Sequence, residues 1–274
     1  MLNRSLLLDG VSEIFIVTSR ITLVTFLISL YCFKEFFSEL NLSFFLKGCL
    51  TGFLAIFIPG WTFIYALKNI SSGLQSIFIS TIPLFTVFWV LLFFKEEKIT
   101  RIKLISVLIG LIGLVILFFS GETGLSKEGD LITGGLLALV GVQGLALSNI
   151  TNKKHLKYIP GKTYLLTQWL FGAGLSIILF FTLGGEIEIL SLSESLKLTG
   201  LAFIDIFNYS LFLYTIKRFS ATFTTLVDYI VPIVGILMGY IFLNEVISNV
   251  FFVTLLLIFI SLYLAVKDES NSLS

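Results

Sequence analysis

The chain has 274 residues, of which 57% are hydrophobic and only 13% are charged, and its formal net charge is +1. A soluble globular domain carries about 25% charged residues, so this chain has too few charges to coat a soluble surface. The near-neutral balance and the lack of a dense basic run give no indication of a nucleic-acid partner.

Nine runs of mostly apolar residues follow one another along the chain, each about long enough to span a bilayer as a helix. They cover residues 14–33, 44–66, 72–94, 102–120, 131–151, 163–183, 197–216, 221–243 and 247–266. Charged residues collect in the short segments between the runs, as in Lys95-Glu96-Glu97-Lys98. We therefore predict an all-α, polytopic membrane protein with almost no soluble part.

Lysine and arginine are concentrated in every second loop, which predicts the orientation of the chain in the membrane. If the C-terminus is cytoplasmic, the outer side holds only Arg4, Lys68, Lys127 and Lys197. The cytoplasmic side then holds the basic pairs Lys153-Lys154 and Lys217-Arg218 and most of the remaining basic residues. We expect a multi-pass protein of the plasma (inner) membrane with its C-terminus in the cytoplasm.

An internal repeat relates the two halves of the chain, because Pro232 lies 149 residues after Pro83. The same offset pairs Phe63 with Phe212, Tyr65 with Tyr214, Lys68 with Lys217, Ser71 with Ser220, Phe93 with Phe242, and Glu96 with Glu245. The two prolines fall on runs that are five helices apart, so the copies have opposite orientations in the membrane. Inverted repeats are typical of secondary transporters. We predict two repeats, residues 1–120 and residues 131–267.

The repeated segments carry a recognisable pattern. An aromatic-x-aliphatic-Lys-x-x-Ser turn stands at Tyr65–Ser71 and again at Tyr214–Ser220. Each turn leads into a helix with a proline, Pro83 or Pro232, and then to a glutamate. The pattern resembles the EamA-type family of the drug/metabolite transporter superfamily.

A glycine motif extends the resemblance in the first half, where Gly110 and Gly113 form a Gly-x-x-Gly pair, whereas Leu262 replaces the second glycine in the other half. The resemblance implies ten helices in two inverted five-helix halves around a central cavity. It also implies transport of a small metabolite.

The expected function is secondary transport, with export of a small metabolite or amino-acid-like compound by alternating access. The alternative is a non-transporting membrane subunit or an inactive truncated fragment. ATP-driven transport is disfavoured, since no phosphate-binding loop motif occurs. A membrane enzyme is disfavoured, since no His-Glu-x-x-His or Gly-x-Ser-x-Gly motif occurs. We expect no cofactor and no metal site, because Cys32, Cys49 and His155 are isolated from one another. The expected partners are the solute and the lipid bilayer, with a homodimer left open.

Polar residues inside the apolar runs are the candidate solute contacts, because polar groups are costly in hydrocarbon. Asp205, Asn208 and Tyr209 share one helix face at i, i+3 and i+4. Asp205 and Asp228 are also candidate proton carriers. The further candidates for lining the cavity are Gln143, Asn149 and Trp61.

Other residues in the runs have structural as well as functional interpretations. Pro83 and Pro232 are candidate kinks or gates, since each frees a backbone carbonyl, but they can equally serve only to shape the bundle. Arg20 fits a side chain that extends to the outer interface. Gln168 fits a hydrogen bond between helices.

The repeat also predicts that the first helix of the usual ten is missing. The run 131–151 finds its partner 149 residues earlier only before Met1, whereas the run 163–183 finds its partner at 14–34. The first half then has four helices and the second has five. We interpret this as a start-site error or a truncated gene, with a functional nine-helix variant as the alternative.

Overall fold

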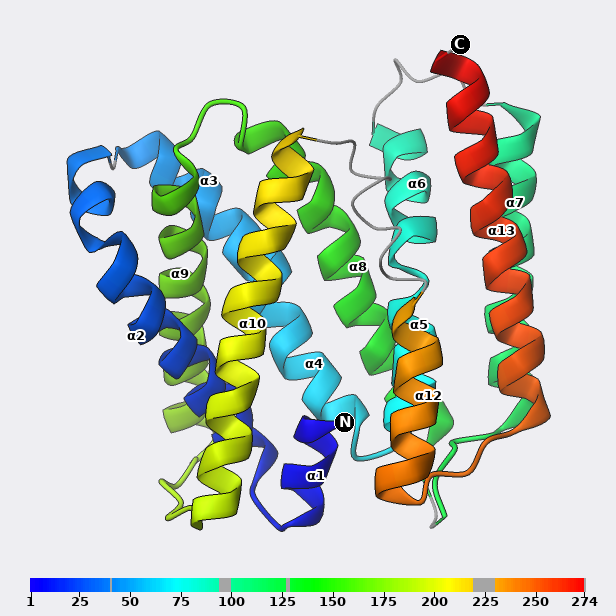
Figure 1. Ribbon diagram of the computed structural model, residues 1–274, viewed down its shortest axis with the longest axis horizontal. Helices are drawn as coiled ribbons and strands as arrows, with labels where there is room; N and C mark the ends of the chain where they lie inside the picture. Colours follow the sequence, from blue (N-terminus) through cyan, green and yellow to red (C-terminus); the bar gives the residue numbers. More distant parts are fainter. Residues whose placement is uncertain (40, 94–99, 127–128, 219–229, 274) are drawn as a thin grey trace. The chain divides into compact units, whose positions relative to one another are not determined.

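Helices make up nearly all of the computed structural model, which describes residues 1–39, 41–93, 100–126, 129–218 and 230–273 (Figure 1). The helices of the first half are α1 (Leu2–Leu8), α2 (Glu13–Glu39), α3 (Leu42–Gly52), the π-helical turn η1 (Phe53–Phe57), α4 (Ile58–Ala66), α5 (Ser72–Ile79), α6 (Ile82–Phe93) and α7 (Arg101–Ser120). Those of the second half are α8 (Leu131–His155), α9 (Gly161–Thr182), α10 (Leu192–Arg218), α12 (Ile230–Leu243) and α13 (Asn249–Leu273). The prediction of an all-α fold is confirmed.

The predicted membrane spans also agree with the helices. Six helical segments are long and apolar enough to cross a bilayer, and three shorter apolar helices match the remaining predictions as far as those residues are described. Large apolar side chains stand exposed along these helices, such as Phe119 at 88% and Phe207 at 71%. A helix satisfies its own backbone hydrogen bonds, so such a surface is stable in lipid.

Proline positions explain two interruptions that the apolar runs did not reveal. The run 44–66 contains the π-helical turn Phe53–Phe57, in which the N–H of Ile58 donates to the carbonyl of Phe53. Pro59 follows directly, has no N–H to donate, and its ring displaces the carbonyl four residues earlier. The run 72–94 is broken between α5 and α6, and Pro83 occupies the first turn of α6, where a backbone N–H is not needed.

The chain forms two compact units, and neither follows the division of the sequence into halves. Unit 1 holds Tyr65–Ile150 and Ala221–Ser274, together with Met1. Unit 2 holds Leu2–Ile64 and Thr151–Ser220. Each unit therefore combines helices from both predicted repeats, and α8 begins in unit 1 and ends in unit 2.

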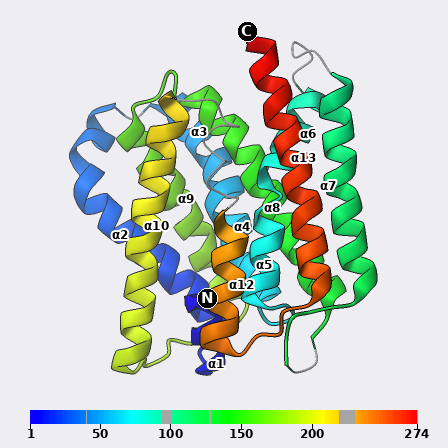
Figure 2. The ribbon, with the colours of Figure 1, turned by 45° about the vertical axis from the view of Figure 1, so that its right-hand side comes forward.

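Helices that occupy equivalent positions in the two repeats pack against each other inside the units. In unit 1, α7 packs on α13, and in unit 2, α2 packs on α9, and each pair is related by the 149-residue offset (Figures 1 and 2). Also in unit 1, α5 packs on α12, whose own equivalent by that offset is α6. Small residues permit these close approaches. Gly113 of the predicted glycine motif, for example, faces Leu257 of α13 so closely that an added Cβ would lie 3.2 Å from the leucine Cβ.

Loops that the topology assigns to one side of the membrane meet at one end of each unit. In unit 1 the N–H of Ser71 donates to the carbonyl of Thr123 at 2.9 Å, and the N–H of Val246 donates to that of Gly124 at 2.9 Å. In unit 2 the N–H of Ser12 donates to the Glu188 carboxylate at 3.0 Å. This arrangement is the one expected when every apolar run crosses the membrane once.

Candidate functional site

The residues expected to contact a solute are divided between the two units. Gln143 and Asn149 on α8, with Pro83 and Pro232, belong to unit 1. The residues that belong to unit 2 are Asp205, Asn208 and Tyr209 on α10 and Trp61 on α4. Asp228 and the run Lys95–Lys98 lie outside the described residues.

An ion pair joins two membrane-spanning helices of unit 2. Arg20 Nε on α2 lies 3.3 Å from Asp205 Oδ2 on α10, and the two side chains are 16% and 28% exposed. Asn3 of α1 adds a third member, because its Oδ1 accepts a hydrogen bond of 3.2 Å from Arg20 Nη1. Charged groups within membrane spans usually face a bundle interior and pair with each other. Arg20 therefore joins Asp205 in a buried charged group instead of extending to the interface.

Tyr209 continues this polar face one turn further along α10. Its hydroxyl donates to Gln168 Oε1 on α9, and its ring meets Trp169 edge to face with centroids 5.9 Å apart. Gln168 Nε2 donates in turn to Asn152 Oδ1 at 3.2 Å, and both amides are fully buried. Asn208 lies on the exposed side of α10. The α10 stripe is thus split, with Asp205 and Tyr209 in contact with neighbouring helices.

Five buried side-chain atoms lack a hydrogen-bond partner in the part of the chain that the structure describes, and all five belong to unit 2. They are Thr18 Oγ1, Arg20 Nε, Asn152 Nδ2, Trp169 Nε1 and Asp205 Oδ2. The Arg20 and Asp205 atoms are those of the ion pair, whose alignment does not meet hydrogen-bond geometry. Buried polar atoms are bonded in most proteins, so each exception calls for a bound solute, ion or water.

We call these residues together the polar core. Two groups within it are bonded, Arg20 with Asp205 and Asn152 with Gln168 and Tyr209, and the residues lie on α2, the end of α8, α9 and α10. Its members are Thr18, Arg20, Asn152, Gln168, Trp169, Asp205 and Tyr209. Beyond the ion pair, three buried polar groups lack a hydrogen-bond partner: the donors Asn152 Nδ2 and Trp169 Nε1, and the Thr18 hydroxyl, which can donate or accept. Together with the charges of Arg20 and Asp205, these groups are of the kinds that bind a small molecule with both acceptor and donor groups.

A neighbouring polar cluster differs from the polar core because its hydroxyls are bonded. The Tyr164 hydroxyl donates to Thr51 Oγ1 at 2.8 Å and lies 3.2 Å from His155 Nδ1. Which of His155 Nδ1 and the Tyr164 hydroxyl donates depends on the tautomer of His155. We interpret this cluster as a joint between α3, α8 and α9.

Trp61 and two candidates in unit 1, Gln143 and Asn149, form side-chain hydrogen bonds outside the polar core. Trp61 is 6% exposed and its Nε1 donates to Ser176 Oγ on α9 at 3.0 Å. In unit 1, Gln143 Oε1 accepts a hydrogen bond of 2.6 Å from Trp89 Nε1. Asn149 Nδ2 donates to Thr86 Oγ1 at 3.3 Å. Their expected role in lining a solute path stays a prediction.

Among the described residues, no group of three or more histidine, cysteine, aspartate or glutamate side chains is arranged to hold a metal ion. The two cysteines, Cys32 and Cys49, are both buried and unbridged.

Comparison with protein families gives a match across both halves of the chain. The profile of the EamA-like transporter family matches residues 4–119 and residues 132–267. The chain belongs to this family. The resemblance found in the sequence is thereby confirmed, and with it the two-repeat helical fold of a multi-pass membrane protein.

Individual relatives of this EamA-family chain are distant. An "Uncharacterized transporter" of Clostridium kluyveri is 28% identical over 200 residues, which are 72% of this chain and 64% of that protein. The chain thus covers less than two thirds of this relative's length. One crystal structure is similar with a TM-score of 0.64 and 18% identity, covering 96% of this chain and 93% of that one. This second likeness concerns the fold alone.

Two members of the polar core, Arg20 and Gln168, were given structural interpretations from the sequence, and three others, Thr18, Asn152 and Trp169, were given none. Thr18 had no distinguishing signal. Trp169 lies within an apolar run, where a tryptophan ring usually packs against its neighbours. Asn152 fell just beyond the predicted run 131–151, whereas α8 continues to His155. A helical projection extended by one turn would have put Asn152 on the same face as Asn149.

Proposed function

We propose that this member of the EamA-like transporter family is a secondary transporter that exports a small metabolite or amino-acid-like compound by alternating access. The observation that carries the proposal is the polar core of unit 2, in which an ion pair and further unpartnered polar atoms lie within membrane spans. Such groups are costly to bury in hydrocarbon. Where they occur within membrane spans, they usually serve binding or proton movement.

The chemistry of the polar core suits a solute with charged or strongly polar ends. The Arg20 guanidinium binds carboxylates and other planar acceptors, and the Asp205 carboxylate accepts hydrogen bonds from an amine. The Trp169 and Tyr209 rings supply an apolar surface next to these groups. A solute that inserts between Arg20 and Asp205 would exchange one ion pair for two.

Asp205 is also our candidate for coupling transport to a proton gradient. A protonated Asp205 is neutral and no longer forms an ion pair with Arg20, so proton uptake would open the ion pair. Asp228, the second carboxylate that the sequence places within a span, is the alternative carrier. In the proposed orientation the C-terminus is cytoplasmic, the protein resides in the plasma (inner) membrane, and it works alone or as a homodimer.

Transport by purified protein in liposomes tests this proposal. We expect Asp205→Asn to abolish flux driven by a pH gradient and to lower solute exchange at least about tenfold, because the ion pair and its proton are lost. Amino acids and other small metabolites are tested as radiolabelled solutes in counterflow. Full proton-driven flux through Asp205→Asn would exclude the coupling role.

Asp130→Asn is the matched control, since it also replaces an aspartate by its amide. Asp130 lies outside the spans, is exposed, and caps α8 by accepting hydrogen bonds from the N–H groups of Ile132 and Thr133 at 2.9 and 3.1 Å. Asparagine caps a helix about as well as aspartate. Transport should therefore survive this change. Failure of the unmodified chain to move any solute in the panel would favour a non-transporting subunit instead.

A further inference from the structure

The segment that contains α1 is bound along unit 2 by three separate polar contacts. Asn3 Oδ1 accepts from Arg20 Nη1 at 3.2 Å, the Ser12 N–H donates to Glu188 Oε1 at 3.0 Å, and Lys197 Nζ of α10 reaches both Ser5 and Asp9. Leu6, between these contacts, is fully buried. A helix of seven residues is not stable on its own, because short isolated helices are marginally stable. The helical structure and the position of α1 therefore depend on these contacts.

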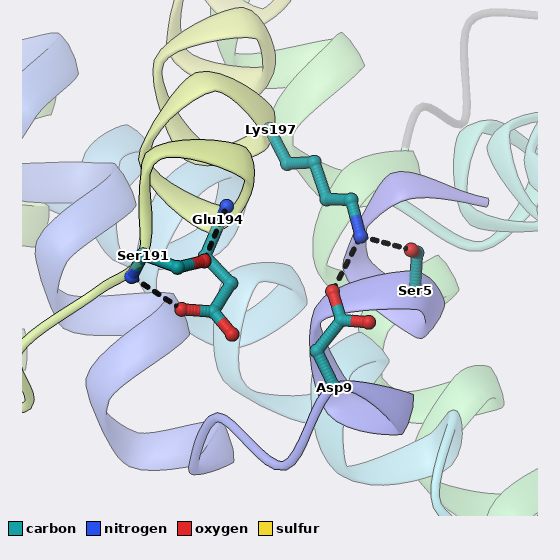
Figure 3. A network of polar contacts seen from close by, with 5 residues as sticks. All are labelled: Ser5, Asp9, Ser191, Glu194 and Lys197. Carbon is teal, nitrogen blue, oxygen red and sulfur yellow. Dashed lines mark hydrogen bonds and ion pairs between the residues drawn. The ribbon is translucent and has the colours of Figure 1, made fainter.

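Lys197 makes the strongest of these contacts. Its ammonium donates to Ser5 Oγ at 2.8 Å and forms an ion pair with Asp9 (Figure 3). The Lys197 and Asp9 side chains are 24% and 35% exposed, so water reaches the pair and it can open and close. We call this contact the Lys197 latch.

The two residues of the Lys197 latch are each close in sequence to a residue at the ion pair of the polar core. Lys197 precedes Asp205 by eight residues on α10, or about 12 Å at 1.5 Å per residue. Asp9 follows Asn3 by six residues, or about 9 Å along α1 and the turn after it. With the latch closed, Asn3 reaches Arg20, which is paired with Asp205. The latch thus fixes the C-terminal end of α1, while Asn3 at its N-terminal end is hydrogen-bonded to the ion pair.

We propose that α1 is a gate over the polar core, closed by the Lys197 latch, and that Asn3 is a positioning residue that keeps Arg20 on Asp205. Opening of the latch frees α1, removes Asn3 from Arg20, and admits water and solute to the ion pair from this end of unit 2. The proposal rests on the proposed function in treating the polar core as the solute site. The access that it describes can be measured without any solute.

Thiol accessibility tests the gate. A single cysteine is introduced by Ala202→Cys in the full chain with Cys32 and Cys49 changed to alanine, and its reaction with a small cationic methanethiosulfonate is followed in liposomes. Ala202 is fully buried and lies three residues before Asp205, on the same face of α10. We expect Lys197→Ala to raise the modification rate about tenfold, a change of about 1.4 kcal/mol in the open–closed equilibrium. Asp9→Asn, a milder change, should raise it in the same direction.

Two controls distinguish a gate from a general loss of structure. The exchanged pair Lys197→Asp with Asp9→Lys should restore the slow rate, because it rebuilds the ion pair. Glu194→Gln, three residues before Lys197, alters only the cap of α10, where the Glu194 carboxylate accepts a hydrogen bond of 2.7 Å from the N–H of Ser191; Figure 3 draws no polar contact between Glu194 and Ser5 or Asp9. It should leave the rate unchanged. Equal rates in Lys197→Ala and its parent, no modification in any variant, or an equal rise in Glu194→Gln would each overturn the proposal.

These outcomes are independent of transport. If the chain moves no solute but its modification rate depends on the latch, the gate is supported and the proposed function is contradicted. If the chain transports normally and its modification rate does not depend on the latch, the proposed function is supported and the gate is contradicted.

Discussion

At the scale of single residues, buried carboxylates do two different jobs in the two units. Asp205 forms an ion pair with Arg20 that lacks hydrogen-bond alignment, whereas both carboxylate oxygens of Glu245 in unit 1 accept hydrogen bonds. Glu245 is 7% exposed and accepts hydrogen bonds from the N–H groups of Ser72 and Gly73 at 2.7 and 3.0 Å and from the Ser72 hydroxyl. A negative charge at a helix N-terminus is favourable, so Glu245 caps α5 from a distance of 173 residues along the chain.

Removing the Glu245 carboxylate should destabilise the protein more than removing an exposed cap. Glu245→Ala leaves two buried N–H groups of α5 without partners, which costs about 1–3 kcal/mol for each such group. Glu194→Ala removes a cap at the start of α10 whose N–H groups water can reach, which costs about 0.5–1 kcal/mol. The measurement is the apparent melting temperature of both variants in detergent. A larger decrease for Glu194→Ala would contradict the assignment of Glu245 as the buried cap.

At the scale of helices, close packing between α3 and α9 depends on Gly52, which directly precedes the π-helical turn. A Cβ at Gly52 would lie 2.4 Å from the backbone carbonyl oxygen of Gln168. Backbone atoms cannot yield as a flexible side chain can. The absence of a side chain at Gly52 therefore brings α3 against the turn of α9 that carries Gln168 of the polar core.

Gly52→Ala should accordingly lower stability by about 1–3 kcal/mol, the usual cost of overpacking, and should weaken solute exchange because Gln168 is displaced. Gly174→Ala on α9 is the matched control, since its added Cβ meets nothing within 4 Å. Melting temperature and counterflow are measured for both. Equal behaviour of the two variants would show that α3 and α9 can separate without consequence.

The helices could be predicted from the sequence much more completely than the polar core. Among the described residues, each of the nine apolar runs contains helix, because length and hydropathy are local properties, and six of the helical segments are long and apolar enough to cross a bilayer. Pro83 lies in the first turn of α6, directly after the break. The pairing of Arg20 with Asp205, across 185 positions, depends on which helices become neighbours, and a periodic pattern does not contain that information. Asp205 and Tyr209 were selected because they interrupt an apolar run. Trp169 was not, because its ring is compatible with one.

At the scale of the whole chain, the repeat and the compact units are related. Leu2 and Thr151, which begin the two segments of unit 2, are separated by the same 149 residues as the paired prolines. Each unit is thus assembled from equivalent pieces of both repeats. This observation supports the proposed division of the sequence into residues 1–120 and 131–267.

The proposed topology predicts opposite accessibility for two loops of unit 2. Ile187, 83% exposed, lies in the loop before α10, and Tyr158, 72% exposed, lies between α8 and α9. In intact cells a membrane-impermeant maleimide should label Ile187→Cys and should label Tyr158→Cys only after permeabilisation, because basic loops remain in the cytoplasm. Both changes are made with Cys32 and Cys49 replaced by alanine. Labelling of Tyr158→Cys in intact cells would reverse the orientation.

The mixed origin of each unit has a consequence for the order in which the protein is made. Helix α2 packs on α9, which is synthesised about 150 residues later, so at about 5–20 residues per second α2 waits about 8–30 s in the bilayer for its neighbour. During that interval Arg20 has no Asp205, and its charge must be accommodated by lipid headgroups, water or a chaperone. Because each unit combines helices from both halves of the sequence, we expect that neither half folds by itself. Halves expressed separately should therefore be degraded, and co-expression should rescue both.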